Sequence, residues 1–164
     1  MNGAMLLPEF DHEFAQTRKT LERVPVQHFG WKPHEKSFSL RDLATHISNI
    51  PGWVPMTLNV NELDMDATSF PEFVPESNAE LLDHFDAAVA EARKALEGAG
   101  AEQLMETWTM RSGGQTVFSM PKAAVLRSFI FNHNVHHRAQ LSVYLRLLDV
   151  PVPALYGPSA DEQG

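Results

Sequence analysis

The chain contains 164 residues, of which 43% are hydrophobic and 21% are charged, values that predict one folded domain and argue against a disordered or fibrous protein. Its formal net charge of -8 argues against nucleic acid as a partner, because binding to phosphates depends on basic side chains. The sequence has no cysteine, which excludes disulfides, thiolate metal ligands and a cysteine nucleophile.

Two helices are predicted in the N-terminal part of the chain. Apolar residues at helical spacing predict the first helix from about residue 6 to residue 24, with Pro8 tolerated in its first turn. After a loop rich in proline, glycine and aromatic residues, Ser39 and Asp42 have the pattern of a capping box, which predicts the start of a second helix. Pro51–Gly52 should kink or interrupt that helix, because proline removes a backbone donor.

A long connection and a third helix follow. Residues 61–76 contain acidic residues and prolines without any period, so we expect them to link two helices. Ser77 and Glu80 form a second capping-box pattern. The apolar residues that follow them predict a helix that ends at Gly98 or Gly100.

The C-terminal part predicts a small hairpin and the longest helix. Alternating residues between 104 and 118 indicate two strands around a Gly-Gly turn. Ser119 near the cap and Pro121 in the first turn predict a helix that runs to about residue 148. Prolines prevent residues 151–164 from continuing it, so they form a C-terminal tail.

Together these elements predict the all-α class. Four helices with one hairpin indicate a four-helix bundle that occupies residues 1–164 as a single domain. No segment has the length and apolar composition of a membrane-spanning helix or a signal peptide. We therefore expect a cytoplasmic protein without a membrane partner.

Two histidines share the inward face of the last predicted helix. At about 100° per residue, His133 and His137 lie within about 60° of Leu126 and Ile130. Side chains four residues apart are neighbours, so both rings can reach one metal ion. The alternative is that one histidine is hydrogen-bonded in the core while the other lies at its margin.

A third histidine favours the metal interpretation. His46 lies beside Leu43 and Ile47 on the second predicted helix and so also borders the core. Burying several imidazoles separately costs free energy, whereas one cation satisfies three acceptors. Three protein ligands leave a position open for water or substrate. Taken by itself, His46 is better explained as a core or rim histidine with a hydrogen bond. His136 lies at the edge of the inward face, which favours a surface position or a contact with a ligand over ligation itself. The remaining histidines are expected to be solvated: His12, His28, His34 and His84.

Other metal signatures fit less well. Glu9 and His12 give one Glu-x-x-His motif, but di-iron bundles need two such motifs. Asn134 stands where a zinc protease helix carries its general-base glutamate. Both classes are therefore disfavoured.

Two stretches carry a resemblance to a known family. The segment THISNIPGW around His46 and the C-terminal segment FNHNVHHRAQLSVYLRLLDVPVPALYGPSADE resemble the DinB (damage-inducible) family. Ala139 replaces the glycine that is usual in that family, a small change within a helix. The resemblance implies that His46, His133 and His137 are metal ligands in a four-helix bundle with a long crossover, often paired as a homodimer.

The resemblance also implies a function. Relatives include thiol-dependent S-transferases and a thiol-dependent isomerase, so we expect a metal-dependent transferase that uses a low-molecular-weight thiol and a small-molecule substrate. A metal-dependent hydrolase and a non-catalytic metal-binding stress-response protein remain alternatives. Gln140, Tyr144 and His136 are expected to contact the ligands or the substrate. The expected divalent ion is zinc or nickel, with iron as an alternative, because imidazole suits all three.

Overall fold

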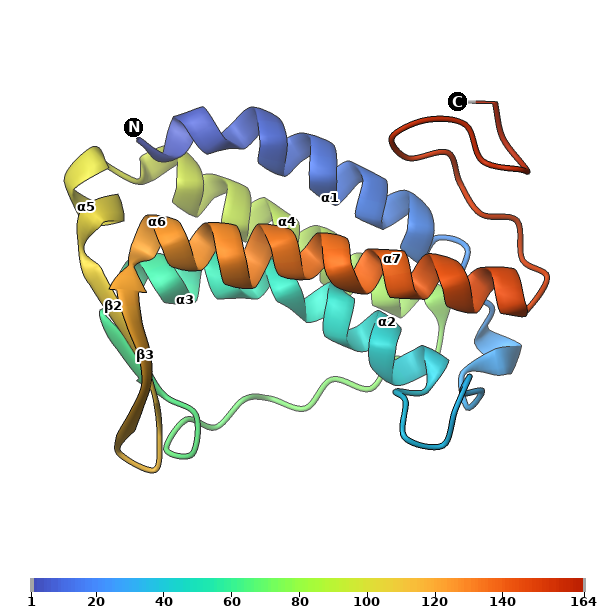
Figure 1. The fold of residues 1–164 in the computed structure, drawn as a ribbon, viewed down its shortest axis with the longest axis horizontal. Helices are drawn as coiled ribbons and strands as arrows, with labels where there is room; N and C mark the ends of the chain where they lie inside the picture. The colour runs from blue at the N-terminus through green and yellow to red at the C-terminus, as the bar shows by residue number, and fades with distance from the viewer. Residues whose placement is uncertain (1, 164) are drawn as a thin grey trace.

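A computed structural model describes residues 2–163, and most of them are helical. Figure 1 shows the long helices lying side by side, with a small sheet at one end and the C-terminal tail at the other. The apolar core lies between these helices. Within residues 2–163, no helix combines the length and the apolar composition needed to cross a membrane.

The first long helix, α1 (Leu7–Leu21), ends three residues earlier than predicted. A short 3-10 turn, η1 (Gly3–Leu6), precedes it. Pro25 explains the early end, because a residue before proline is disfavoured in the α conformation, and here that residue is Val24. A second 3-10 turn, η2 (Val26–His28), follows in the predicted loop.

The second predicted helix is confirmed together with its interruption. In α2 (Leu40–Asn49), Ser39 and Asp42 form the reciprocal capping box that the sequence predicted. The helix then passes through a 3-10 turn, η3 (Ile50–Gly52), into α3 (Trp53–Asn59). Because the chain keeps its helical direction through Pro51, α2 and α3 form one bent rod in Figure 1.

The third predicted helix is α4 (Asn78–Gly98), and its cap differs from the prediction in one detail. The Ser77 side chain accepts from the Glu80 backbone N–H, as expected. The Glu80 carboxylate, however, accepts from the backbone N–H of Glu76 instead of Ser77. A short helix, α5 (Ala101–Met105), follows it and was not predicted.

The sheet has three strands, so the prediction of an isolated hairpin in an all-α fold was wrong. β2 (Thr107–Ser112) and β3 (Gln115–Pro121) are antiparallel, and β1 (Glu62–Asp64) joins the other edge of β2 in parallel. β1 lies inside the connection that was expected to link two helices. The sequence did not predict this strand because three residues are too few to show an alternating pattern. The Asp64 carboxylate accepts from the backbone N–H groups of the turn between β2 and β3 and so fixes β1 against it.

The last helical rod is not uniformly α-helical. It consists of α6 (Lys122–Val125), a π-helical stretch η4 (Leu126–Phe131) and α7 (Asn132–Leu147). It begins later than predicted because Ser119 and Pro121 belong to β3. Figure 1 shows this rod running along the whole length of the molecule, beside α1 and the bent rod of α2 and α3.

The C-terminal tail is attached to the helices by a buried arginine. Arg138 on α7 is 1% exposed and donates to the Glu13 carboxylate of α1 at 2.7 Å. Tyr156 in the tail donates to the same carboxylate at 2.6 Å and also contacts the arginine. The Glu13 carboxylate of α1 therefore binds both α7 and the tail.

Candidate metal centre

The three histidines predicted as ligands come together between α2 and α7. The Nε2 atom of His133 lies 3.2 Å from Nε2 of His46 and 2.7 Å from Nε2 of His137. Within residues 2–163, this is the only group of three or more potential ligand residues whose donor atoms could hold one metal ion. His46 comes from the last turn of α2, whereas the other two lie one turn apart on α7, so the packing of two helices creates the group.

Hydrogen bonds on the outer side of two rings define which nitrogen is free. His133 Nδ1 lies 3.2 Å from the Phe129 carbonyl oxygen, and His137 Nδ1 lies 2.7 Å from Gln140 Oε1. Both oxygens are acceptors, so each Nδ1 carries the hydrogen. In a neutral imidazole this leaves a lone pair on Nε2. The two Nε2 lone pairs therefore face each other, an arrangement that a cation would stabilise.

The spacing of the nitrogens fits a small divalent ion. Zinc–nitrogen bonds of about 2.0–2.1 Å in tetrahedral geometry place the ligand atoms about 3.3 Å apart. The His46 to His133 spacing of 3.2 Å is close to this value, and the His133 to His137 spacing of 2.7 Å is shorter. The donor set consists of neutral nitrogen atoms, which suit zinc, nickel or iron.

Burial keeps these imidazoles neutral. Burial is the main cause of the lowered pKa of His46, which falls to about 4, and the neighbouring His137 and His133 also lower this pKa. The pKa values of His133 and His137 are also lowered, in both cases chiefly by burial. At neutral pH all three rings can thus offer a lone pair to a cation.

The other predicted site residues take different positions. Gln140 contacts His137 directly, as described above. His136 is exposed, with its ring 4.8 Å from that of His137, and it lies outside the group of three Nε2 atoms. Tyr144 donates a hydrogen bond to the Phe38 carbonyl at 3.2 Å, so its hydroxyl is used to hold the loop before α2.

Two contributions to the site were not foreseen from the sequence. The Phe129 carbonyl that orients His133 belongs to η4, and a main-chain acceptor leaves no trace in residue identity. The Phe38 ring lies 5.9 Å from the ring of His46. The loop that Tyr144 holds places the Phe38 ring beside His46. In the sequence, only the aromatic composition of that loop indicated this contact.

The remaining histidines lie elsewhere. His12, His28 and His34 are exposed, as expected. His84 is half-buried, which corrects the expectation of a solvated side chain. Its Nε2 atom lies 2.7 Å from Asn49 Oδ1, and its ring stacks on Phe73 at 4.0 Å.

Comparisons with known proteins agree with this architecture. The uncharacterized protein YrdA of Bacillus subtilis is 24% identical over 156 residues, which covers 95% of this chain and 89% of that protein. The crystal structure of the DinB-like protein YjoA of Bacillus subtilis has a TM-score of 0.72 at 18% identity, covering 98% of this chain and 99% of the other. A DinB-like protein from Bacillus cereus has a TM-score of 0.68 at 22% identity, with coverages of 92% and 95%.

These structural similarities show a shared fold, since the identities are low. The family model of the DinB family matches residues 1–163, almost the entire length of the sequence. The chain therefore belongs to the DinB family.

Proposed function

We propose that His46, His133 and His137 bind one divalent metal ion and that the protein is a metal-dependent transferase using a low-molecular-weight thiol. The observation that carries the metal assignment is the convergence of three imidazoles, two of which direct Nε2 lone pairs toward each other. Phe129 and Gln140 support it by binding the opposite nitrogens of two rings. Such outer hydrogen bonds are typical of metal-ligating histidines.

The chemistry follows from the donor set and the lack of cysteine. A divalent ion held by three neutral imidazoles would lower the pKa of a thiol or a water molecule at its open position. Because the chain has no cysteine, the sulfur must come from a cosubstrate. The loop held by Tyr144 brings the Phe38 ring beside His46.

We also propose that the long helices form a four-helix bundle. α1 packs against α4 and α7, and α2 packs against the same two helices. This pairwise packing supports a four-membered arrangement, in which the segment between α3 and α4 is the long crossover.

The metal assignment is tested by measuring the metal content of untagged protein after loading with zinc or nickel. We expect one ion per chain in the native protein and a strong loss in His46→Ala and His133→Ala. His136→Ala is the matched control, because that ring is adjacent to His137 but exposed, and it should keep the ion. Full occupancy in His46→Ala would refute the assignment.

The transferase activity needs a separate assay. Consumption of cysteine or glutathione in the presence of 1-chloro-2,4-dinitrobenzene should depend on the loaded metal and disappear in the two ligand variants. A loaded protein that leaves thiol unchanged but hydrolyses 4-nitrophenyl acetate would instead be a hydrolase. A loaded protein that does neither would contradict both enzymatic alternatives for these substrates and favour a binding role.

A further inference from the structure

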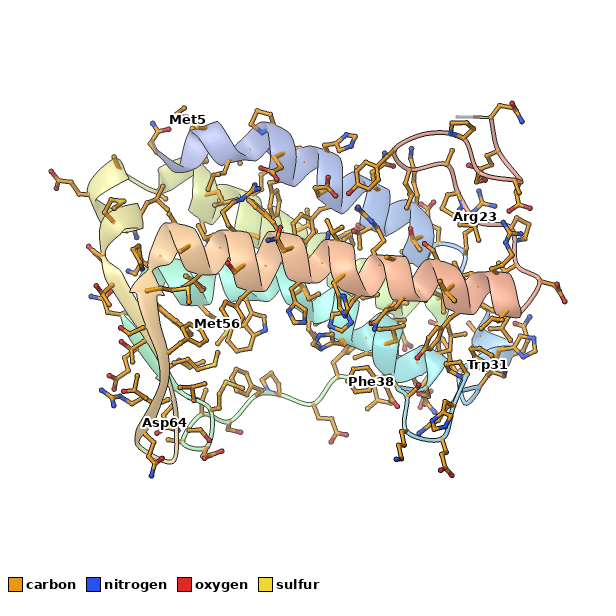
Figure 2. The ribbon with its side chains drawn as sticks, in the orientation of Figure 1. Met5, Arg23, Trp31, Phe38, Met56 and Asp64 are labelled. Carbon is orange, nitrogen blue, oxygen red and sulfur yellow. The ribbon has the colours of Figure 1, made fainter. Side chains whose placement is uncertain are left out.

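The rod formed by η4 and α7 exposes one side from Phe129 to Leu147. In Figures 1 and 2, no other helix or loop among residues 2–163 crosses in front of this part of the rod. Exposed positions on this side recur every three or four residues, so they lie on one face of the helix. We call this face the α7 strip, and its members are Phe129, Asn132, His136, Ala139, Gln140, Val143 and Leu147.

The α7 strip contains no aspartate, glutamate, lysine or arginine, although such residues make up 21% of the chain. Within Asn132–Leu147, the one exposed side chain of these types is Arg146, and it pairs with Asp161 of the tail. The other long helix, α4, exposes many charged residues: Glu80, Asp83, Glu91, Arg93, Lys94 and Glu97. Depletion of charge is what distinguishes the centre of a protein interface from the rest of a protein surface.

The charge and the shape of the α7 strip fit a second copy of the chain. Each chain has a formal net charge of -8, so two copies repel each other unless they meet on faces without carboxylates. Near one end of the strip, five residues line a hollow of about 430 Å³: Ser128, Phe129, Asn132, His133 and His136. Near the other end, Val143 and Leu147 project and are each 58% exposed. The strip therefore carries both a hollow and the apolar side chains that can fill it.

An antiparallel pairing matches these two ends. It places the projecting end of each strip on the hollow end of the other, so the same contact forms twice around a two-fold axis. The axis passes near Ala139, in the middle of the strip, where a small side chain lets two helices approach closely. Tyr156 of the tail is 65% exposed and lines a second hollow of about 410 Å³ together with Ala139, which widens the apolar surface beside the axis. A parallel pairing would instead set the two hollows against each other.

The α7 strip also supports two of the three histidines. The Phe129 carbonyl lies 3.2 Å from His133 Nδ1, and Gln140 Oε1 lies 2.7 Å from His137 Nδ1. Both hydrogen bonds are exposed in the single chain, so water competes for the same groups. His133 also lines the hollow, so a side chain seated there would cover the outer edge of its ring.

We infer that a second copy of the chain packs its own α7 strip antiparallel on this one and covers the outer hydrogen bonds of His133 and His137. The partner's Val143 and the partner's Leu147 fill the hollow beside Phe129. Each copy thus contributes side chains to the surroundings of the other copy's histidines. The pairing itself needs no metal, whereas its effect on metal binding rests on the proposed function.

The molecular mass of the metal-free protein in sedimentation at micromolar concentration tests the pairing. We expect a dimer for the native protein and about tenfold or weaker association for Leu147→Glu, because each copy would then carry a carboxylate into the contact. Met105→Glu is the matched control, since Met105 is 67% exposed but lies on α5, and this variant should remain a dimer. Circular dichroism checks that each variant folds. A monomeric native protein, or a Leu147→Glu variant that associates like the native protein, would overturn the inference.

Because the chain has no cysteine, introduced cysteines can map the arrangement. Ala139→Cys should form a disulfide between two chains on mild oxidation, because the axis brings the two copies of this residue together. A mixture of Asn132→Cys and Val143→Cys should be joined by a short bismaleimide. Asn132→Cys alone should not be joined, since its two copies would lie about 20 Å apart along the helices. The opposite result, in which Asn132→Cys is joined to itself and the mixture is not, would show a parallel pairing and refute the one inferred.

The zinc affinity in a chelator competition tests the effect of the pairing on the histidines. Leu147→Glu should bind zinc several-fold more weakly than the native protein, although its added carboxylate alone would attract a cation. By reciprocity, zinc should strengthen the native dimer. Equal zinc affinities of the native protein and Leu147→Glu would show that the second copy does not protect the two hydrogen bonds. Native protein that pairs through the α7 strip but takes up no zinc would refute the proposed function and leave the pairing intact.

Discussion

Removing the Glu13 carboxylate should destabilise the protein far more than removing an exposed carboxylate from the same helix. Arg138 is 1% exposed and Glu13 is 12% exposed, and their side chains meet at 2.7 Å. Glu13→Ala would leave the buried guanidinium with the main-chain carbonyl of residue 13, Thr17 and Tyr156 as its partners. Breaking a buried pair from one side costs about 3–5 kcal/mol. We expect about 3 kcal/mol, because those three partners remain.

Asp11→Ala is the matched control for this prediction. Asp11 also lies on α1 and pairs with Arg93 at 3.0 Å, but both side chains are 46% exposed. Such a pair contributes about 0–1 kcal/mol. Urea unfolding followed by circular dichroism gives the free energy of unfolding of both variants. If Glu13→Ala lost no more stability than Asp11→Ala, the structural importance assigned to the buried arginine would be wrong.

Three further predictions concern the histidine site. Bound metal should be released steeply as the pH falls below about 6.5, with more than one proton taken up per ion, because protons compete for the imidazole lone pairs. Dialysis across the acidic range measures the bound metal. Retention down to about pH 4 would contradict imidazole ligation. The metal-free protein should lose stability as the pH falls from about 6.5 to the lowered pKa of His46, about 4. In that window the unfolded chain binds a proton that the folded chain does not. A free energy of unfolding in urea that stays constant across these pH values would contradict this. Gln140→Leu should weaken metal binding about 10- to 100-fold while Gln140→Glu retains it, because the hydrogen bond to His137 Nδ1 orients that ring. A chelator competition measures the affinity of each variant. Equal metal affinities of the native protein and Gln140→Leu would show that Gln140 does not support the site.

The parts of the fold that depend on local pattern were predictable. The helical periods, the capping box of Ser39 and the interruption at Pro51 are all encoded within a few residues, and the structure confirms them. β1 was missed because it is formed by pairing with β2, a partner distant in the sequence. The conformation of η4 was missed because its apolar residues fit an α-helical period as well as a π-helical one.

The candidate site shows the same division. The juxtaposition of His133 and His137 follows from their spacing, and His46 could be added because it borders the core. The orienting contact from Phe129 could not be predicted, since it is made by a main-chain carbonyl. Tyr144 was expected at the site, but its hydroxyl binds the loop at Phe38. Which way a half-buried side chain points depends on packing that the sequence pattern does not specify.

The π-helical stretch η4 also affects how the length of this chain can vary. The stretch joins α6, whose buried Lys122 anchors it to the Leu58 carbonyl at 2.9 Å, to α7 with its two histidines. A π-helical turn contains more residues than an α-helical turn, so deleting one residue within Leu126–Phe131 would let this stretch become α-helical while the side chains of His133 and Arg138 keep their directions. Each residue of an α-helix advances the direction of the side chains by about 100°. Deleting one residue between His133 and His137 in α7 would therefore rotate one histidine away from the other. The loss of one residue should accordingly be tolerated in the connection before α4 and in η4, and rejected in α7.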